Sequence, residues 1–504
     1  MGSITLKMQH PALYSEAGDV VRLFYGDTPL TLYREGDPEP EAGLVIVQRA
    51  RREGAGYLHE ALLKDPDGVA LTSTYRQQEM GEGTLEQKRY FKYGVKIALY
   101  HLLTQATGKV MPWGSLTGIR PTKLAYELLS QGMTPQQAAQ YLRDTFDVSR
   151  DKADLLFQIL KAQQGIVCHE SFRQLDVYVG IPFCPSRCTY CSFAACDIRK
   201  NRKWVEPYLA ALHHEIKVCG QMAQQAGWQV RAVYLGGGTP TAISAPQLSA
   251  LLEAVNLAFP GAAEVTVEAG RPDSIDRDKL RALREAGVGR VSINPQTMNG
   301  ETLMRMGRTH TPEQIVQAFA LAREAGFEAI NMDLIAGLPG ESAQDMARTL
   351  RQIADLAPDN LTVHTLAMKR ASKLKEEKGR FSLPSGEEVL KMLEAARTAA
   401  AEWGMEPYYL YRQKYMTGNF ENIGYSLPGK ACIYNIDIME ETHSILALGA
   451  GGISKWVYPA ENRLERTPNV KNIEQYIARV DEMIARKEPR LCGALLDRPE
   501  TVIV

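Results

Sequence analysis

The sequence predicts an α/β protein: a partial (β/α)6 barrel of the TIM type, flanked by an N-terminal α+β domain and a C-terminal α+β extension. Two observations carry this prediction. Between about residues 176 and 366, short apolar segments alternate six times with longer segments of helical periodicity, the order typical of parallel strands with helical crossovers. Glycine-rich and polar motifs follow several of these segments, and barrel enzymes place their chemistry at the C-terminal strand ends.

Each barrel element can be placed from its pattern. The six strands are expected at 176–182, 230–235, 264–268, 290–296, 329–335 and 361–366. Helices are expected at 205–225, 245–257, 312–326 and 342–356, where apolar residues recur at helical spacing. Six such units make about three quarters of a full eight-stranded barrel, so we expect an open one.

The segments before and after the barrel lack this alternation. Three domains are therefore expected: an N-terminal α+β domain at 1–170, the barrel at 171–370 and a substrate-covering region at 371–504. In the first, strands are expected at 20–25, 30–34, 44–48 and 69–75, a long helix at 85–107 and a turn-rich loop at 113–122. In the last, helices are expected at 386–404 and 470–485, and strands at 407–415 and 445–448.

Composition narrows the class of protein. Of 504 residues, 45% are apolar and 23% charged, as in globular proteins with a sizeable core. The net charge of −1 gives no bulk electrostatic basis for a nucleic-acid partner. No apolar run reaches the roughly 20 residues of a membrane-spanning helix, and eight cysteines without a signal peptide indicate a reducing cytoplasm.

A triplet of cysteines follows the first barrel strand. Cys184, Cys188 and Cys191 have the spacing CxxxCxxC, and three such thiolates can hold three irons of a [4Fe–4S] cluster. No fourth cysteine lies at equally tight spacing, so one iron is left open for a substrate or cofactor. The alternatives are a zinc site, which usually takes paired spacings and four ligands, and three buried small side chains. The other cysteines are scattered, so no second cluster is expected.

Polar residues gather at the ends of the later strands. The run Gly236–Thr239 follows the second strand and lets a ligand approach the backbone closely. Glu268, Gln296 and Asp333 end three further strands in apolar surroundings, where a polar group is costly without a partner. Satisfied structural hydrogen bonds are the alternative. Two more candidates for ligand contacts are Arg308 and Tyr190. The alternatives are a surface arginine and a core tyrosine.

Taken together, these motifs resemble the radical S-adenosylmethionine (SAM) enzymes. Closer resemblance is to the oxygen-independent coproporphyrinogen III oxidase (dehydrogenase) family, through YVGIPFC at 178–184, GGGTPT at 236–241, INPQT at 293–297 and DLIAGLPG at 333–340. The N-terminal domain and the segments 118–123 and 408–424 resemble the HemZ branch of that family. The resemblance implies a [4Fe–4S] cluster on the three cysteines, with SAM on the open iron. By the same resemblance, the SAM-contact positions are Tyr178, Gly237, Gly238, Thr239, Glu268, Gln296, Arg308 and Asp333.

The implied reaction is oxidative decarboxylation of two propionates of coproporphyrinogen III, giving protoporphyrinogen IX in haem biosynthesis. It would need a low-potential electron donor of the flavodoxin or ferredoxin type and an oxygen-poor setting. Basic residues are candidate anchors for the propionates, because arginine pairs bidentately with carboxylates; a solvated basic loop is the alternative. The candidates are Arg120, Lys369, Arg370 and Arg412.

Two positions depart from the best-studied oxidase branch of the family. Phe193 stands where that branch has a further cysteine, and Gly180 where it has a histidine. A phenylalanine at the first position also occurs in the related haem-chaperone branch. One alternative is therefore a haem-binding chaperone-like protein, with His364 and His443 as candidate haem ligands. Another is a radical SAM enzyme acting on a different tetrapyrrole.

Overall fold

The computed structural model divides into two compact units, Met1–Gln158 and Ile159–Val504. The structure describes residues 3–34, 36–38, 43–78, 84–118, 120–167, 174–193, 195–369, 372–376, 381–413, 420–458, 461 and 463–493.

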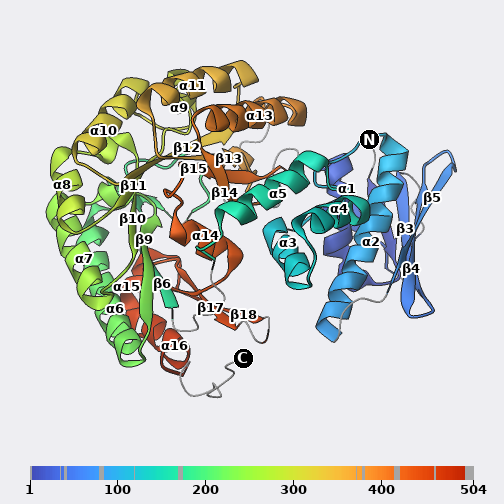
Figure 1. Ribbon diagram of the computed structural model, residues 1–504, viewed down its shortest axis with the longest axis horizontal. Coiled ribbons are helices and arrows are strands. Elements are labelled where there is room, and N and C mark those ends of the chain that lie inside the picture. The colour runs from blue at the N-terminus through green and yellow to red at the C-terminus, as the bar shows by residue number, and fades with distance from the viewer. Residues whose placement is uncertain are drawn as a thin grey trace. The chain divides into compact units, whose positions relative to one another are not determined.

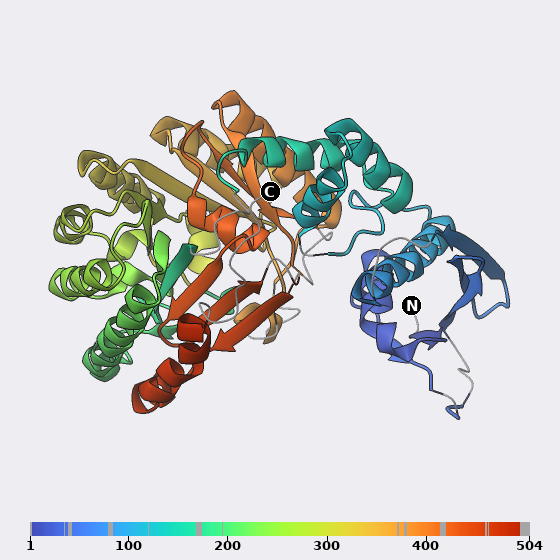
Figure 2. The ribbon, with the colours of Figure 1, turned by 60° about the horizontal axis from the view of Figure 1, so that its bottom comes forward.

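The first unit is a sheet with helices packed on it (Figure 2). Its strands follow the order β2-β1-β3-β4-β5; they are β1 (Ile4–Met8), β2 (Leu30–Leu32), β3 (Leu44–Glu53), β4 (Gly56–Lys64) and β5 (Ala70–Gln77). Helices α1 (Tyr14–Tyr25) and α2 (Thr84–Thr107) share the apolar core with this sheet. Helices α3 (Pro121–Ser130) and α4 (Pro135–Phe146) also belong to this unit, and α5 (Arg150–Ala162) begins in it and ends in the second unit.

The strand predicted at 20–25 is wrong, because these residues form the second half of α1. Ala17, Val20, Val21 and Phe24 are buried, and this i, i+3, i+4, i+7 spacing is helical. A short window starting at Val20 leaves out Ala17 and begins with two β-branched residues, Val20 and Val21, which favour a strand. Helix α2 and strands β2, β3 and β5 lie where elements were predicted, whereas β1 and β4 were not predicted.

In the second unit, the predicted six parallel strands are confirmed. They pair in sequence order: β6 (Gln174–Ile181), β9 (Gln229–Gly237), β10 (Glu264–Gly270), β11 (Arg290–Ile293), β12 (Ala329–Ala336) and β13 (Asn360–Thr365). Figure 1 shows the helices as an outer layer around them: α6 (Val205–Gln225), α7 (Ala245–Ala258), α8 (Arg277–Glu285), α10 (Pro312–Glu324), α11 (Ala343–Leu356) and α13 (Gly386–Glu402).

Three of these helices begin with the same capping arrangement. Ser244, Thr311 and Ser342 each cap a helix, and the residue three positions later returns a side-chain hydrogen bond to the cap. Such a capping box satisfies two backbone N–H groups that have no partner inside the helix. These capping residues thus set where α7, α10 and α11 start, and α7 and α11 begin shortly after the ends of β9 and β12.

C-terminal strands extend the barrel sheet on both sides. On one side lie β15 (Asn422–Ser426) and β14 (Glu406–Tyr411), and on the other β16 (Ser444–Leu448), β17 (Ile453–Tyr458) and β18 (Arg463–Pro468). Strands were predicted at β14 and β16 only, and residues 414 and 415 of the predicted strand at 407–415 lie outside the described residues. No helix of the described residues is long and apolar enough to cross a membrane.

The single helix predicted at 470–485 is wrong. The chain instead forms α15 (Ile473–Ala478) and α16 (Val480–Gly493), because the backbone at Arg479 leaves the helical conformation, with φ −128° and ψ 24°. Helix α16 packs on α6. There Lys487 Nζ lies 2.6 Å from Glu215 Oε1, and both side chains are fully buried.

Candidate active site

A cavity of about 660 Å³ lies at the C-terminal ends of the parallel strands. All twelve residues predicted to hold the cluster or SAM line it: Cys184, Cys188, Cys191, Tyr178, Tyr190, Gly237, Gly238, Thr239, Glu268, Gln296, Arg308 and Asp333. The residues come from β6, β9, β10 and β12 and from the loops that follow strands. Parallel strands bring their carboxyl ends to one edge of a sheet, so segments far apart in sequence meet here.

The cysteine loop is tied to the glycine run after β9. The backbone N–H groups of Gly238 and Thr239 donate to the carbonyls of Ile181 and Phe183, both at 2.7 Å. The Thr239 hydroxyl also lies 3.5 Å from Cys184 Sγ. The first cysteine is therefore held against the end of the second barrel strand by both backbone and side chain.

The surroundings of the cysteines fit a cluster of several irons. Burial raises the pKa of Cys184 to about 12 and also raises that of Cys191, so a metal would have to displace the thiol protons. Among the described residues, no three His, Cys, Asp or Glu side chains converge as ligands of one metal ion would. A cubane cluster presents its irons at separate corners, so three cysteines around one cavity suit it better than a single zinc ion.

None of the other cysteines that the structure describes adds a ligand to this triplet. Cys196 and Cys219 are not among the residues that line the cavity. Cys432, at the start of helix α14 (Ile433–Glu440), lines the cavity, but its thiol lies 3.2 Å from Oε1 of Glu264. Cys492 is exposed on α16, and Cys168 lies outside the described residues.

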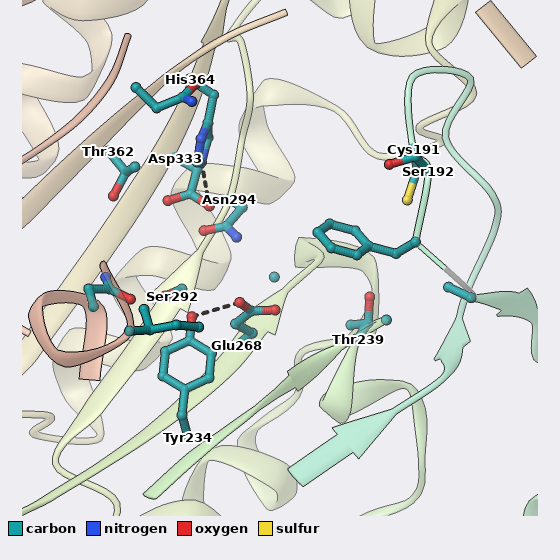
Figure 3. Close-up of a pocket in the computed structure, with 18 of the residues that line it drawn as sticks. Cys191, Ser192, Tyr234, Thr239, Glu268, Ser292, Asn294, Asp333, Thr362 and His364 are labelled. Atoms are coloured by element: carbon teal, nitrogen blue, oxygen red, sulfur yellow. Dashed lines mark hydrogen bonds and ion pairs between the residues drawn. The ribbon is translucent and has the colours of Figure 1, made fainter. Parts of the chain in front are cut away.

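Carboxylates occupy the side of the cavity opposite Cys191 and Thr239 (Figure 3). Tyr234 donates a hydrogen bond of 2.6 Å to Glu268. Burial raises the pKa of Glu268 to about 7, because a desolvated carboxylate is unfavourable, and a bound cationic group would reverse that cost. Asp333 accepts a hydrogen bond of 2.7 Å from Asn331, and His364 Nε2 lies 3.6 Å from its second oxygen.

Two features of the cavity point to a polar ligand. Within the described part of the chain, Asn294 Oδ1 is buried without a hydrogen-bond partner, and a buried acceptor of this kind costs free energy until a donor reaches it. Gln296 has a left-handed backbone, φ 70°, a conformation that non-glycine residues adopt mainly where function requires it. Hydrogen bonds to Asp333 and Ile335 hold it there. These observations fit a cofactor with amine or hydroxyl donors.

Arg308 is not a surface residue, and it contacts the partly buried Tyr190. Arg308 is buried and donates to the Tyr190 hydroxyl at 3.0 Å and to the Asn294 carbonyl. Its Nη1 also lies 3.8 Å from Cys188 Sγ. The guanidinium thus lies between the cysteine loop and the end of β11, where the predicted contact with the SAM carboxylate remains a prediction.

The four candidate anchors for propionates are placed differently. Lys369 lines the cavity, with Nζ 5.7 Å from the centre of the Phe193 ring. Arg412 is 2% exposed and does not line it; burial lowers its pKa to about 10, and Glu421 partly offsets that effect. Arg120 belongs to the first unit, directly before α3, and Arg370 lies outside the described residues.

Several cavity residues were not predicted. Arg271 follows β10 and is almost fully buried. Its position three residues after Glu268, just beyond the end of β10, was the available signal, although the turn that follows decides where its side chain points. Tyr234 and Tyr434, also not predicted, stack in a series with the predicted Tyr178, with ring centres 6.3 Å apart for Tyr178 and Tyr234 and 4.5 Å apart for Tyr234 and Tyr434. Period-two alternation along β9 would have placed Tyr234 on the cavity side.

Comparisons with known proteins agree with this geometry. The sequence model of the radical SAM superfamily matches residues 178–353. The oxygen-independent coproporphyrinogen-III oxidase-like protein HemZ of Bacillus subtilis is 39% identical over 407 residues, 80% of this chain and 81% of that protein. The heme chaperone HemW of the same organism is 32% identical over 46% of this chain and 62% of its own length.

A solved structure is similar as well. The coproporphyrinogen III oxidase HemN of Escherichia coli, described as a radical SAM enzyme, has 27% sequence identity and a TM-score of 0.51, over 64% of this chain and 73% of that one. The fold and the site thus define a radical SAM protein, whose cofactors are a [4Fe–4S] cluster and SAM. The chain belongs to the oxygen-independent coproporphyrinogen III oxidase family, in its HemZ-like branch.

We expect Gly238→Ala to lower SAM affinity and iron content by roughly tenfold, because overpacking of this kind costs about 1 to 3 kcal/mol. A Cβ at this position would lie 2.6 Å from the Phe183 carbonyl oxygen and 2.8 Å from that of Ile181, so the cysteine loop must shift. Equilibrium dialysis with SAM and iron analysis measure the effect. Gly300→Ala is the control, because its nearest contact would be Pro312 at 3.7 Å. Equal effects of both changes would contradict the account.

Proposed function

We propose that the protein catalyses the oxygen-independent oxidative decarboxylation of coproporphyrinogen III to protoporphyrinogen IX. The observation that carries the proposal is the convergence of three cysteines and nine candidate SAM contacts on one cavity whose walls also include stacked tyrosines. The family relationship supports the tetrapyrrole as the class of substrate.

A bound cluster and SAM supply one-electron and hydrogen-abstraction chemistry. Cys184, Cys188 and Cys191 would hold the cluster, and three cysteines leave one iron open. The chain's own residues orient and enclose the reactants. Glu268 and Asp333 accept hydrogen bonds from Tyr234 and Asn331, which fixes both carboxyl groups on the side of the cavity opposite Cys191 (Figure 3).

The wall formed by tyrosines suits a substrate built of several pyrrole rings. Tyr178, Tyr234 and Tyr434 are stacked with interplanar angles of 15° and 21°, and aromatic faces contact apolar rings over a large area. A second group, Tyr408, Tyr409 and Tyr411, comes from β14 and also lines the cavity. Lys369 supplies a cation at the cluster side of the cavity for one propionate.

A second candidate function is haem binding, as the name of the chaperone relatives suggests. Phe193 favours it: the side chain is 64% exposed beside the cysteine loop. Of the two candidate haem ligands, His364 lines the cavity. His443 is fully buried, with Nδ1 3.3 Å from Asp437, so His364 is the better candidate.

One experiment separates these functions. Anaerobically reconstituted, reduced protein is incubated with SAM and coproporphyrinogen III, and the porphyrins are analysed after oxidation. The proposal expects protoporphyrin and one 5′-deoxyadenosine per propionate lost. Formation of 5′-deoxyadenosine with no decarboxylated product would overturn it, and haem bound at one equivalent without turnover would favour the second function. Other tetrapyrroles, tested in the same way, reveal a different substrate.

We further expect Lys369→Gln to raise the KM for coproporphyrinogen III roughly tenfold, the loss of one charge-assisted contact. Abortive SAM cleavage without substrate should be nearly unchanged. Lys391→Gln is the control, because Lys391 lies on α13 and pairs with Glu387 at 3.2 Å. A KM unchanged in Lys369→Gln would remove this residue from the substrate site.

A further inference from the structure

We propose that Arg271 raises the reduction potential of the iron–sulfur cluster by placing a fixed positive charge against the sulfur of Cys188. The inference rests on the assignment of Cys188 as a cluster ligand. It concerns how easily the cluster accepts an electron and not which substrate is used.

The Arg271 side chain is built into the wall of the cavity. It is 3% exposed. Its Nη1 donates to the Ser186 hydroxyl at 3.0 Å and lies 3.7 Å from Cys188 Sγ. Ser186 and Cys188 flank the same turn of the cysteine loop, so the guanidinium contacts the loop at two points.

The other edge of the guanidinium is held by Asp273. Nε and Nη2 donate to the two carboxylate oxygens of Asp273 at 2.9 Å and 2.7 Å. This is the bidentate geometry that only arginine provides. His310 Nδ1 lies 3.5 Å from the same carboxylate. The side chain is thus clamped between the loop and Asp273, and it does not need to rearrange when the cluster gains charge.

The backbone of the loop after β10, which carries Arg271, is fixed as well. Ser274 donates its backbone N–H and its hydroxyl to the Arg271 carbonyl, at 2.9 Å and 2.7 Å. The Ser274 hydroxyl lies 2.7 Å from that of Thr241. Thr241 comes from the segment after β9, so two strand-end loops hold the arginine in register with the cysteines.

The expected electrostatic effect has a definite sign. Reduction adds a negative charge to the cluster, and nearby cations and hydrogen bonds to cluster sulfurs stabilise the reduced form. Arg271 and Arg308 both approach Cys188 Sγ, at 3.7 Å and 3.8 Å. Asp273 offsets part of the Arg271 charge, but it lies on the far edge of the guanidinium. Arg271 is the better test, because Arg308 also lies at a predicted SAM contact.

The test is a redox titration of the reconstituted holoprotein, followed by electron paramagnetic resonance without SAM or substrate. In Arg271→Gln we expect the ratio of reduced to oxidised cluster at a fixed potential to fall at least tenfold, equivalent to about 59 mV for one electron. Arg271→Lys keeps the charge and should lose less than Arg271→Gln. Arg277→Gln, which removes an exposed arginine paired with Glu324, should leave the potential unchanged.

A ratio within threefold of wild type in Arg271→Gln, at full iron content, would overturn the proposal. So would equal losses in the Lys and Gln variants. If Arg271→Gln fails to hold iron, the comparison of Arg271→Lys with wild type decides, because a shift of the predicted sign must remain. Turnover of coproporphyrinogen III by wild-type protein is a separate readout. If wild-type protein turns over normally and Arg271→Gln leaves the potential unchanged, this inference alone is refuted. If Arg271→Gln shifts the potential but wild-type protein shows no turnover, only the proposed function is refuted.

Discussion

Alanine at Cys184, Cys188 or Cys191 should abolish SAM cleavage. A cubane cluster held by two thiolates instead of three is poorly bound. Among the described cysteines outside the triplet, Cys432 alone lines the cavity, and its thiol contacts Glu264. No described cysteine is therefore placed to replace a lost ligand. We expect iron per chain to fall severalfold and 5′-deoxyadenosine formation to drop at least a thousandfold. Iron analysis and chromatography of the SAM products measure both quantities.

Cys196→Ala is the matched control for this prediction. Cys196 lies in the same loop, where β8 (Cys196–Asp197) pairs with β7 (Phe183–Cys184), but it does not line the cavity. We expect near-normal iron content and SAM cleavage in this variant. Loss of the cluster in Cys196→Ala, or its retention after any change in the triplet, would show that the ligands are assigned wrongly.

Lys487→Met should destabilise the barrel unit by about 3 to 5 kcal/mol, the usual cost of leaving one partner of a buried ion pair alone. Lys487 and Glu215 are both fully buried and lie 2.6 Å apart. Glu215 also accepts a 2.6 Å hydrogen bond from Tyr476 and one of 2.7 Å from the Gly449 backbone. The loop after Gly449 includes Gly451 and Gly452, which line the cavity, so the loss should also weaken SAM binding.

The midpoint of urea unfolding measures this change in stability. The double variant Glu215→Gln with Lys487→Met should be more stable than Lys487→Met alone, because no uncompensated charge remains buried. Lys391→Met removes a surface ion pair and should change the free energy of unfolding by less than about 1 kcal/mol. A Lys487→Met protein as stable as wild type would mean that the buried pair contributes little.

Local patterns predicted the barrel well because its strands are apolar and are followed by glycine or polar residues. Strand β9 ends at Gly237 and β10 at Gly270, so strand and loop are both visible in a short window. The C-terminal strands are different. Strand β16 pairs with β6, with Ser444 opposite Leu175. The strand itself is visible in a local window, but its pairing joins distant segments and is not.

The candidate site was predictable to the extent that strand ends define it. Glu268 and Asp333 were found because their strands were found. Arg271 was missed because its direction depends on the turn at Pro272–Ser274, which strand patterns do not describe. Arg412 and Tyr411 are neighbours, yet only Tyr411 lines the cavity, because successive side chains of an extended chain point to opposite sides. Charge alone could not tell which side Arg412 takes.

The central claim is that a cluster on Cys184, Cys188 and Cys191 binds SAM at an iron without a protein ligand. Electron paramagnetic resonance of the reduced, anaerobically reconstituted protein, recorded with and without SAM, tests it most directly. The account predicts the signal of one [4Fe–4S] cluster per chain, with g-values that change when SAM is added. Absence of a cubane signal, or a signal that SAM leaves unchanged, would contradict it.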